Sequence, residues 1–162
     1  MHPNGALLQR LFTALNEHDH AAMGFCYHKT EKVLFHDIAF HLVEAKHILA
    51  MWHMICLTDI RASFRVVDST TTSARVKLID DYTFSATGRR VRNEIESQFR
   101  LSDGLIVEHV DDCDAHLWAA MAFGRVIGFL PGRLRLLRSL KGRSLLRAFI
   151  DEHPQYREDV TV

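Results

Sequence analysis

The first half of the chain repeats its apolar residues at helical spacing. Between residues 4 and 17 they return every three or four positions on one face, at Leu7, Leu8, Leu11, Phe12 and Leu15. A second, short helix is predicted over 21–27, with Asp19 as its N-cap. A third is predicted over 43–57. Between the second and third, the apolar residues at 32–37 indicate a short strand that ends in a polar pair.

From residue 60 onward the apolar positions alternate, which is the period of a β-strand. Strands are predicted over 60–68, 74–86 and 105–112, with a further strand that carries Val91, Ile95 and Phe99. Tight turns at Thr87-Gly88-Arg89 and Ser102-Asp103-Gly104 join them, because Asp-Gly readily supplies the positive φ values of a hairpin turn. Four consecutive strands joined in this way form an antiparallel meander.

Two further helices follow the strands. One begins at Asp114, whose carboxylate can cap the first amides, and runs to Phe123. Glycines and a proline between Gly124 and Gly132 then break the chain before a basic helix over 134–150.

This order of elements predicts an α+β fold. Helices packed on one face of a curved antiparallel sheet make a cone-shaped structure, with a hollow at its open end for a small molecule. We expect residues 1–132 to form this pocket domain. Residues 133–162 are expected to add a basic helix and tail, packed on the same domain or on a partner subunit.

Composition is typical of one globular domain. The chain has 162 residues, of which 48% are hydrophobic and 25% charged, enough for a core and too apolar for a disordered chain. Its 20 basic and 20 acidic residues cancel, so net charge gives no argument for nucleic acid. Three widely spaced cysteines favour neither a disulfide framework nor a zinc site. Without a signal peptide or an apolar run of about 20 residues, a cytoplasmic protein is expected.

The bases are unevenly distributed along the chain. Residues 115–150 contain seven arginines and lysines and no acid. The basic helix could pack over the pocket or a partner subunit, dock on an anionic membrane surface, or bind nucleic acid. Packing within the molecule or in a homodimer is favoured, and nucleic acid least, because no aromatic residues are interleaved with the bases.

Candidate chemistry centres on four polar residues. Asp37 follows a buried strand, where an apolar wall would raise its pKa and suit it to proton abstraction; a turn or capping role is the alternative. His109 and Asp111 share one strand face, so the carboxylate can orient the imidazole. Asp114 completes the densest polar cluster of the chain, although these acids could simply end the strand and cap the next helix.

Five more side chains are candidates for contact with a ligand. Trp52 and His53 lie on the third predicted helix, where Trp52 suits the pocket wall and His53 the mouth. Tyr82, Asn93 and Ser97 interrupt apolar strand faces with hydrogen-bonding groups, as pocket linings do. The eleven histidines lack the spacing of metal ligands, so neither a metal nor another cofactor is expected.

Several stretches in this order resemble a known superfamily. Phe35-His36-Asp37-Ile38-Ala39-Phe40 and Met51-Trp52-His53-Met54 resemble the first strand and third helix of the nuclear transport factor 2-like superfamily, in its polyketide-cyclase (SnoaL-like) and ketosteroid-isomerase-like branch. Tyr82 to Arg89 and Asp103 to His109 resemble its long hairpin and final strand. The resemblance covers about residues 6–125. It implies a cone-shaped pocket, a homodimer formed through the sheet, and acid–base aspartates in the regions of Asp37 and Asp114.

The leading hypothesis is a cofactor-independent isomerase, cyclase or dehydratase acting on a small apolar carbonyl compound. Asp37 or Asp114 would remove a proton next to the carbonyl, and His109, oriented by Asp111, would stabilise the enolate. The alternative is a non-catalytic module that binds a hydrophobic ligand or dimerises.

Overall fold

The computed structural model describes residues 3–29, 32–124 and 133–157, with the main chain alone over 133–141. Its helices are α1 (Pro3–Asn16), α2 (His20–Gly24), α3 (Ala45–Cys56), α4 (Ala115–Phe123), α6 (Arg133–Glu152) and the 3-10 turn η1 (Pro154–Tyr156). Its strands are β1 (Leu34–His36), β2 (His41–Leu42), β3 (Arg61–Ser69), β4 (Ser73–Phe84), β5 (Arg89–Ser102) and β6 (Leu105–Cys113). The predicted α+β class is confirmed.

The six strands form one curved, unclosed sheet in the order β2-β1-β6-β5-β4-β3. The predicted meander from β3 to β6 is confirmed, each strand antiparallel to the next. The sequence did not predict β2, nor the parallel pairing of β1 with β6 that makes the sheet mixed. A three-residue strand carries too short an alternation to specify a partner some seventy residues away.

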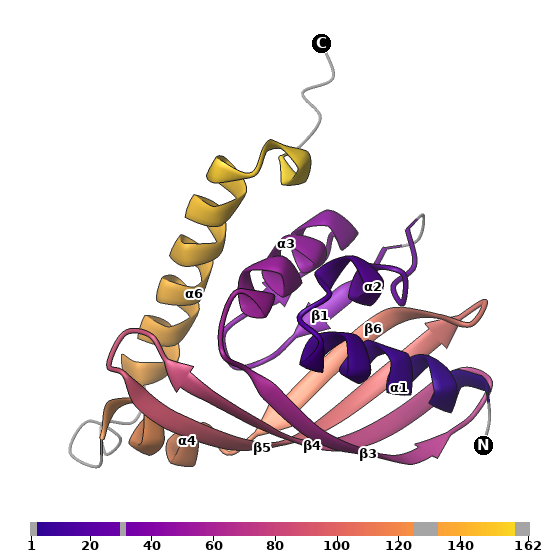
Figure 1. The fold of residues 1–162 in the computed structure, drawn as a ribbon, viewed down its shortest axis with the longest axis horizontal. Helices are drawn as coiled ribbons and strands as arrows, with labels where there is room; N and C mark the ends of the chain where they lie inside the picture. Colours follow the sequence, from indigo (N-terminus) through magenta and orange to yellow (C-terminus); the bar gives the residue numbers. More distant parts are fainter. Residues whose placement is uncertain (1–2, 30–31, 125–132, 158–162) are drawn as a thin grey trace.

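Helices α1, α2 and α3 lie over the concave side of the sheet, and α4 closes one end (Figure 1). The apolar stripe predicted for the first helix is buried there, and Phe12 packs against Phe64 of β3 and Phe99 of β5. Asp19 caps α2 by accepting a hydrogen bond from the Ala22 amide, as predicted. One long side of the concave face is thereby filled with apolar residues.

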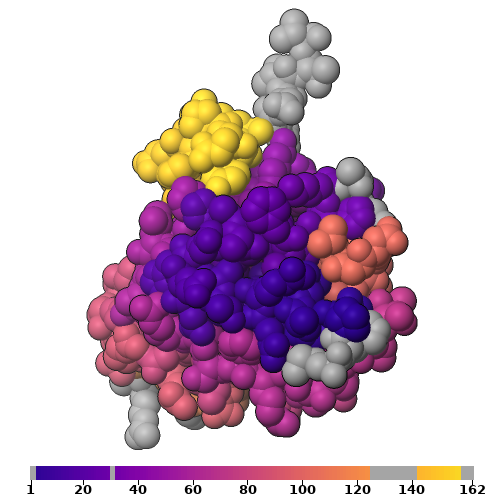
Figure 2. Space-filling model, turned by 45° about the vertical axis from the view of Figure 1, so that its right-hand side comes forward, coloured from indigo at the N-terminus to yellow at the C-terminus, as the bar shows by residue number. Residues whose placement is uncertain are grey.

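Helix α6 stands beside α3 (Figure 1), and its C-terminal part lies on the molecular surface in Figure 2. Leu146 and Phe149 join the main hydrophobic core, so this helix packs on its own chain. Gly142, within the helix, allows close approach: a Cβ there would lie 3.4 Å from Ala39 and from the Phe40 ring. That contact offsets the low helix propensity of glycine. The predicted break at Gly128, Pro131 and Gly132 lies outside the described residues.

The described helices include none that combines the length and the apolar character needed to span a membrane.

Candidate functional site

Polar side chains gather on the concave face where β4, β5 and β6 run side by side. Inward positions alternate with outward ones, and the strand pairing sets Asp80 opposite Asn93 and Ser97 opposite Asp111. Asp37 follows β1, which pairs in parallel with β6, so it extends the same row next to Asp111. A patch of carboxyl, amide and hydroxyl groups thus interrupts an otherwise apolar surface. We call Asp37, Asp80 and Asp111 the acidic triad.

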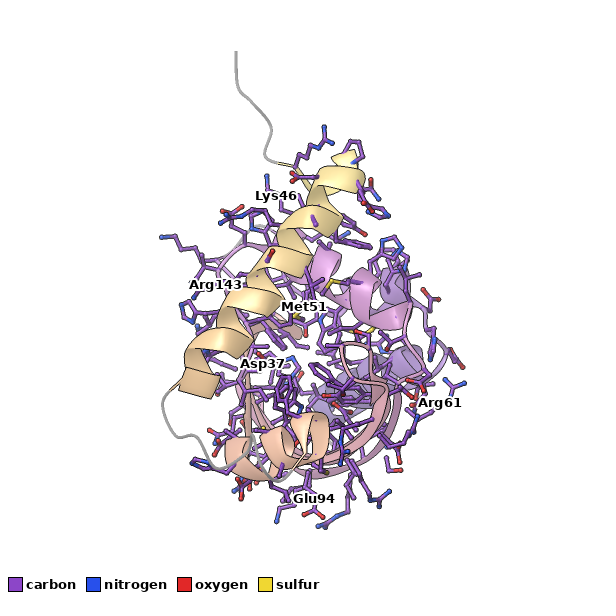
Figure 3. The ribbon with its side chains drawn as sticks, turned by 90° about the vertical axis from the view of Figure 1, so that its left-hand side faces the viewer. Asp37, Lys46, Met51, Arg61, Glu94 and Arg143 are labelled. Carbon is purple, nitrogen blue, oxygen red and sulfur yellow. The ribbon has the colours of Figure 1, made fainter. Side chains whose placement is uncertain are left out.

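Asp37 is held by the turn that joins β1 to β2. Its Oδ1 accepts hydrogen bonds from the amides of Ala39 (2.7 Å) and Phe40 (2.5 Å), and its own amide donates to the Phe40 carbonyl. Figure 3 shows Asp37 between α6 and α4, whereas Arg61 and Glu94 lie at the periphery. Burial raises the pKa of Asp37 to about 6, outweighing the two amides, with a smaller contribution from the charge of Asp111. Asp37 therefore stabilises the turn through its hydrogen bonds and also has a carboxyl group with a raised pKa.

Asp80 is the member of the triad that the sequence did not reveal. Its side chain is half-buried, but its Oδ1 atom is fully buried. Among the described residues, this is the one buried side-chain nitrogen or oxygen atom that has no hydrogen-bond partner. Burial raises its pKa to about 8, and the charges of Asp111 and Asp37 raise it further. This raised pKa favours the protonated form of Asp80, which can donate a hydrogen bond. The sequence did contain a signal for this position: Asp80 lies two and four residues after the buried Leu78 and Val76, on the same face of the strand.

His109 is fully buried and tied at both ring nitrogens. Nδ1 lies 2.8 Å from the Tyr27 hydroxyl and Nε2 lies 2.9 Å from Asp111 Oδ1. The Ser97 hydroxyl donates a hydrogen bond to the same Asp111 oxygen. The predicted orientation of His109 by Asp111 is thus present, but the ring is fully buried and has no surface open to a ligand.

Aromatic rings enclose His109 on its other sides. Phe99 and Phe35 lie 4.2 and 4.9 Å from it, centroid to centroid, and Trp52 lies 6.0 Å away. The indole of Trp52 donates to the Tyr27 hydroxyl at 3.0 Å. Trp52 is therefore a buried wall residue with a hydrogen-bonding role, and Tyr27 is a further site residue that the sequence did not indicate.

Asp114 lies apart from the acidic triad. It caps α4, accepting hydrogen bonds from the amides of His116 (2.9 Å) and Leu117 (3.0 Å), and its side chain is exposed. These amides hold its pKa below the usual value, the Leu117 amide most strongly. The structure thus brings Asp37, His109 and Asp111 together and places Asp114 as a helix cap.

The other predicted contact residues divide between two places. Tyr82 accepts a hydrogen bond from the Trp118 indole at 2.7 Å, and burial raises its pKa to about 12. Burial raises the pKa of the Cys113 thiol beside the triad, and the side chain of the buried Asn93 opposes that rise. His53, in contrast, stacks on His20 at 3.7 Å and contacts the Tyr156 hydroxyl, at the junction of α2, α3 and η1.

The acidic triad has no arginine or lysine partner in the described part of the chain. Asp68 and Asp59 do form ion pairs, with Arg75 and Arg90, but they are exposed. Within the described residues there is also no group of three His, Cys, Asp or Glu side chains placed to hold a metal ion. The carboxyl groups on the concave face can take part in proton transfer and hydrogen bonding.

An α+β cone whose concave face carries partly buried acids defines a class of small-molecule pocket folds. The family model for the SnoaL-like domain matches residues 8–109. The chain belongs to that family, within the nuclear transport factor 2-like superfamily, and the resemblance noted in the sequence is confirmed. No curated protein matches the chain in sequence.

Solved structures share the fold at low sequence identity. An LEH-like epoxide hydrolase of M. tuberculosis is 12% identical with a TM-score of 0.59, covering 83% of this chain and 95% of its own. A putative polyketide cyclase from Silicibacter sp. TM1040 is 20% identical with a TM-score of 0.59, at 73% and 93% coverage. A protein of ketosteroid-isomerase-like fold from Catenulispora acidiphila, solved with trimethylamine, is 8% identical with a TM-score of 0.61, at 72% and 91% coverage. These likenesses concern the fold alone.

Proposed function

We propose that this chain is a cofactor-independent acid–base catalyst acting on a small, mostly apolar carbonyl compound, as an isomerase, cyclase or dehydratase would. The observation that carries the proposal is Asp80: a carboxyl on the concave face with a buried, unpartnered oxygen. Native proteins rarely leave such an atom without a partner. Rotation of the protonated Asp80 carboxyl would bring this oxygen to a ligand and let it donate a hydrogen bond to a ligand oxygen.

Asp37 and Asp80 divide the two roles of acid–base catalysis. Above pH 6 Asp37 is mainly ionised and can accept a proton, whereas Asp80 keeps its proton up to about pH 8. Two carboxyls whose surroundings separate their pKa values are a common arrangement for a base and an acid at neutral pH. His109 and Asp114, which the sequence offered as direct participants, have no direct part in this proposal.

The proposed step is enolisation. Asp37 takes the proton from the carbon next to the carbonyl, and the electron pair of that C–H bond forms the C=C bond of the enolate. The carbonyl π electrons move to oxygen, where the developing charge is stabilised by the hydrogen bond from Asp80. Where a C=C bond of the substrate is conjugated with the enolate, return of the proton from Asp37 to the far carbon completes an isomerisation. Where the enolate carbon instead attacks a second carbonyl, the C=O π bond breaks, and the resulting alkoxide takes the proton from Asp37 to complete a cyclisation.

Hydrogen exchange tests this step without knowledge of the natural substrate. Cyclic ketones of one to four rings are incubated with the protein in D2O, and deuterium at the carbon next to the carbonyl is followed by NMR. The protein is expected to accelerate exchange for some ring sizes, and Asp37→Asn to lower that rate by at least about 100-fold. Asp112→Asn, which removes an acid from the outer face of the same strand as Asp111, serves as the control and keeps the full rate.

A non-catalytic binding module is the competing function. It would bind some of these ketones without accelerating exchange, and Asp37→Asn would leave binding unchanged. Dimerisation through the sheet and membrane contact by α6 stay predictions; sedimentation velocity and co-sedimentation with anionic vesicles test them.

A further inference from the structure

A chain of hydrogen bonds runs from helix α3 through the core to the acidic triad. The Trp52 indole reaches the Tyr27 hydroxyl at 3.0 Å, and that hydroxyl lies 2.8 Å from His109 Nδ1. His109 Nε2 then lies 2.9 Å from Asp111 Oδ1. The first three side chains are buried, and the fourth is part of the triad. Residues on α3, after α2 and on β6 are thereby linked in one line.

The donors and acceptors in this chain have one consistent direction. An indole N–H can only donate, so the Tyr27 oxygen accepts from Trp52. The single hydroxyl proton of Tyr27 is then directed at His109 Nδ1, which must accept it. A neutral imidazole that accepts at Nδ1 carries its proton at Nε2. That proton is donated to Asp111, which also accepts from Ser97.

The opposite tautomer would leave groups unmatched. With its proton on Nδ1, His109 would meet the Tyr27 oxygen, and the buried hydroxyl proton would lose its acceptor. The unprotonated Nε2 would then face the Asp111 carboxylate, two acceptors 2.9 Å apart. Burial raises the pKa of Tyr27 well above its ordinary value. Tyr27 therefore keeps its hydroxyl proton, and that proton still needs an acceptor. Leaving buried polar groups unpaired costs more than the bonds themselves contribute.

We propose that Tyr27, fixed by Trp52, is a positioning residue that locks His109 in its Nε2–H tautomer and so directs an N–H donor at Asp111, beside Asp37 and Asp80. This role rests on the proposed function and deepens it, because the lock governs the charge next to the base and the acid. The polar groups that act on or with Asp111 are His109 and Cys113 on its own strand, Ser97 on β5, Asp80 on β4, Asp37 after β1 and Tyr27 after α2.

The lock has a defined consequence for the two reacting carboxyls. Burial is the largest cause of the raised pKa of Asp37 and of Asp80, and the negative charge of Asp111 adds to it in both. An unlocked His109 could turn away or take a second proton, and either change would alter the field of Asp111. Tyr27 and Trp52 would thus adjust the proton affinity of groups that they do not touch.

Nitrogen NMR of the histidines tests the lock directly in the full chain without a substrate. With 15N-labelled histidine, long-range proton–nitrogen spectra distinguish Nε2–H, Nδ1–H and doubly protonated rings. At pH 7 the His109 ring is expected to show one protonated nitrogen, Nε2. A resonance pattern of Nδ1–H, or of a doubly protonated ring, would overturn the proposal.

Variants separate the lock from general packing. Tyr27→Phe is expected to give mixed or doubly protonated His109 and to lower the titration midpoints of Asp37 and Asp80 by about half a pH unit or more. Trp52→Phe, which keeps the Tyr27 hydroxyl but frees its direction, is expected to produce a smaller change of the same kind. It also gives a reading if Tyr27→Phe does not fold. A pure Nε2–H ring in both variants would contradict the lock.

A matched control is available in a second tyrosine–histidine pair. The Tyr156 hydroxyl lies 3.1 Å from His53 Nδ1, outside the chain of Trp52, Tyr27 and His109. Tyr156→Phe should leave the His109 spectrum and both carboxyl midpoints unchanged. Failure of the lock is distinguishable from failure of the proposed function: the wrong tautomer ends the lock whatever the turnover. If His109 carried its proton on Nε2 but the protein accelerated hydrogen exchange in none of the ketones, the lock would be confirmed and the proposed catalytic function would be wrong.

Discussion

Asp80 stands directly opposite Asn93 in the pairing of β4 with β5, yet the buried Oδ1 of Asp80 has no hydrogen-bond partner among the residues that the structure describes. The arrangement leaves a protonated carboxyl ready to donate to something other than the protein. The following expectations derive from this arrangement and from the residues around it.

The rate of hydrogen exchange in the ketone should have a bell-shaped dependence on pH. Asp37 must be ionised and Asp80 protonated, so kcat/KM is expected to rise through about pH 6 and fall through about pH 8. Because the two groups interact, the two midpoints belong to the pair. Initial rates from pH 4.5 to 9.5 check this profile. A rate that increases steadily to pH 9.5 would exclude Asp80 as the proton donor.

Asp80→Asn should stabilise the protein, and increasingly so toward high pH. A carboxyl whose folded-state pKa is raised to about 8 keeps its proton where the unfolded chain, with a value of about 3.9, has lost it. The wild type therefore loses stability as pH rises from about 4 to 8, whereas the asparagine variant lacks this loss. At pH 8.5 the gain is expected to be about 1–3 kcal/mol, below the full linkage value because solvent reaches the half-buried side chain.

Urea unfolding at pH 5, 7 and 8.5 measures this difference. Asp112→Asn, an exposed acid on the outer face of β6, is the control for the loss of one carboxyl and should show no such pH-dependent gain. Equal stability of wild type and Asp80→Asn at all three pH values would show that Asp80 titrates normally.

Asp114 should matter for helix α4 and not for proton transfer. Its carboxylate caps the amides of His116 and Leu117, so Asp114→Ala is expected to cost about 1 kcal/mol of unfolding free energy. Asparagine is an equally good cap, so Asp114→Asn should cost a few tenths at most. Both variants are expected to keep the ketone exchange rate of the wild type. A large fall in that rate for Asp114→Asn would return this residue to the catalytic set.

The docking of α6 should weaken in mild acid. His53 stacks on His20 and meets His153 and Phe149 of the C-terminal region at 5.1 Å. Burial and then the neighbouring His20 and His153 lower the pKa of His53, so the docked state resists the proton that an undocked ring accepts below about pH 6.5. Amide hydrogen exchange over 146–152, corrected for intrinsic pH effects, should therefore quicken from pH 7 to pH 5.

His53→Phe is the informative variant for that expectation. It keeps a ring against His20 and Phe149 but cannot be protonated, so the acid-induced increase in exchange should be smaller. An identical pH response in the variant would assign the effect to other groups.

The regular elements were predictable because their signals are local. The helical stripe of α1, the alternation in β3 to β6 and the Asp103-Gly104 turn all lie within short windows of sequence, and all appear in the structure. The position of β1 in the sheet was not predictable, since its partner β6 is remote in sequence and three residues do not specify a pairing.

The same distinction applies to the site. Asp37, His109 and Asp111 stood out because polar residues end apolar strands. Tyr27 did not, because its meaning depends on His109, 82 residues later. Asp80 is followed by Asp81, which faces outward and pairs with Arg90. In the sequence the two acids resemble a solvent-exposed pair, although adjacent residues of a strand point to opposite faces of the sheet and Asp80 therefore points inward.

The most direct test of the account is the carboxyl titration of Asp37 and Asp80. Side-chain carboxyl carbons of 13C-aspartate-labelled protein are assigned with Asp37→Asn and Asp80→Asn and followed by NMR from pH 3 to pH 10. The account predicts midpoints of about 6 for Asp37 and about 8 for Asp80. If both carboxyls titrated below about pH 4.5, near the ordinary value for aspartate, neither would have the proton affinity that the proposed chemistry requires.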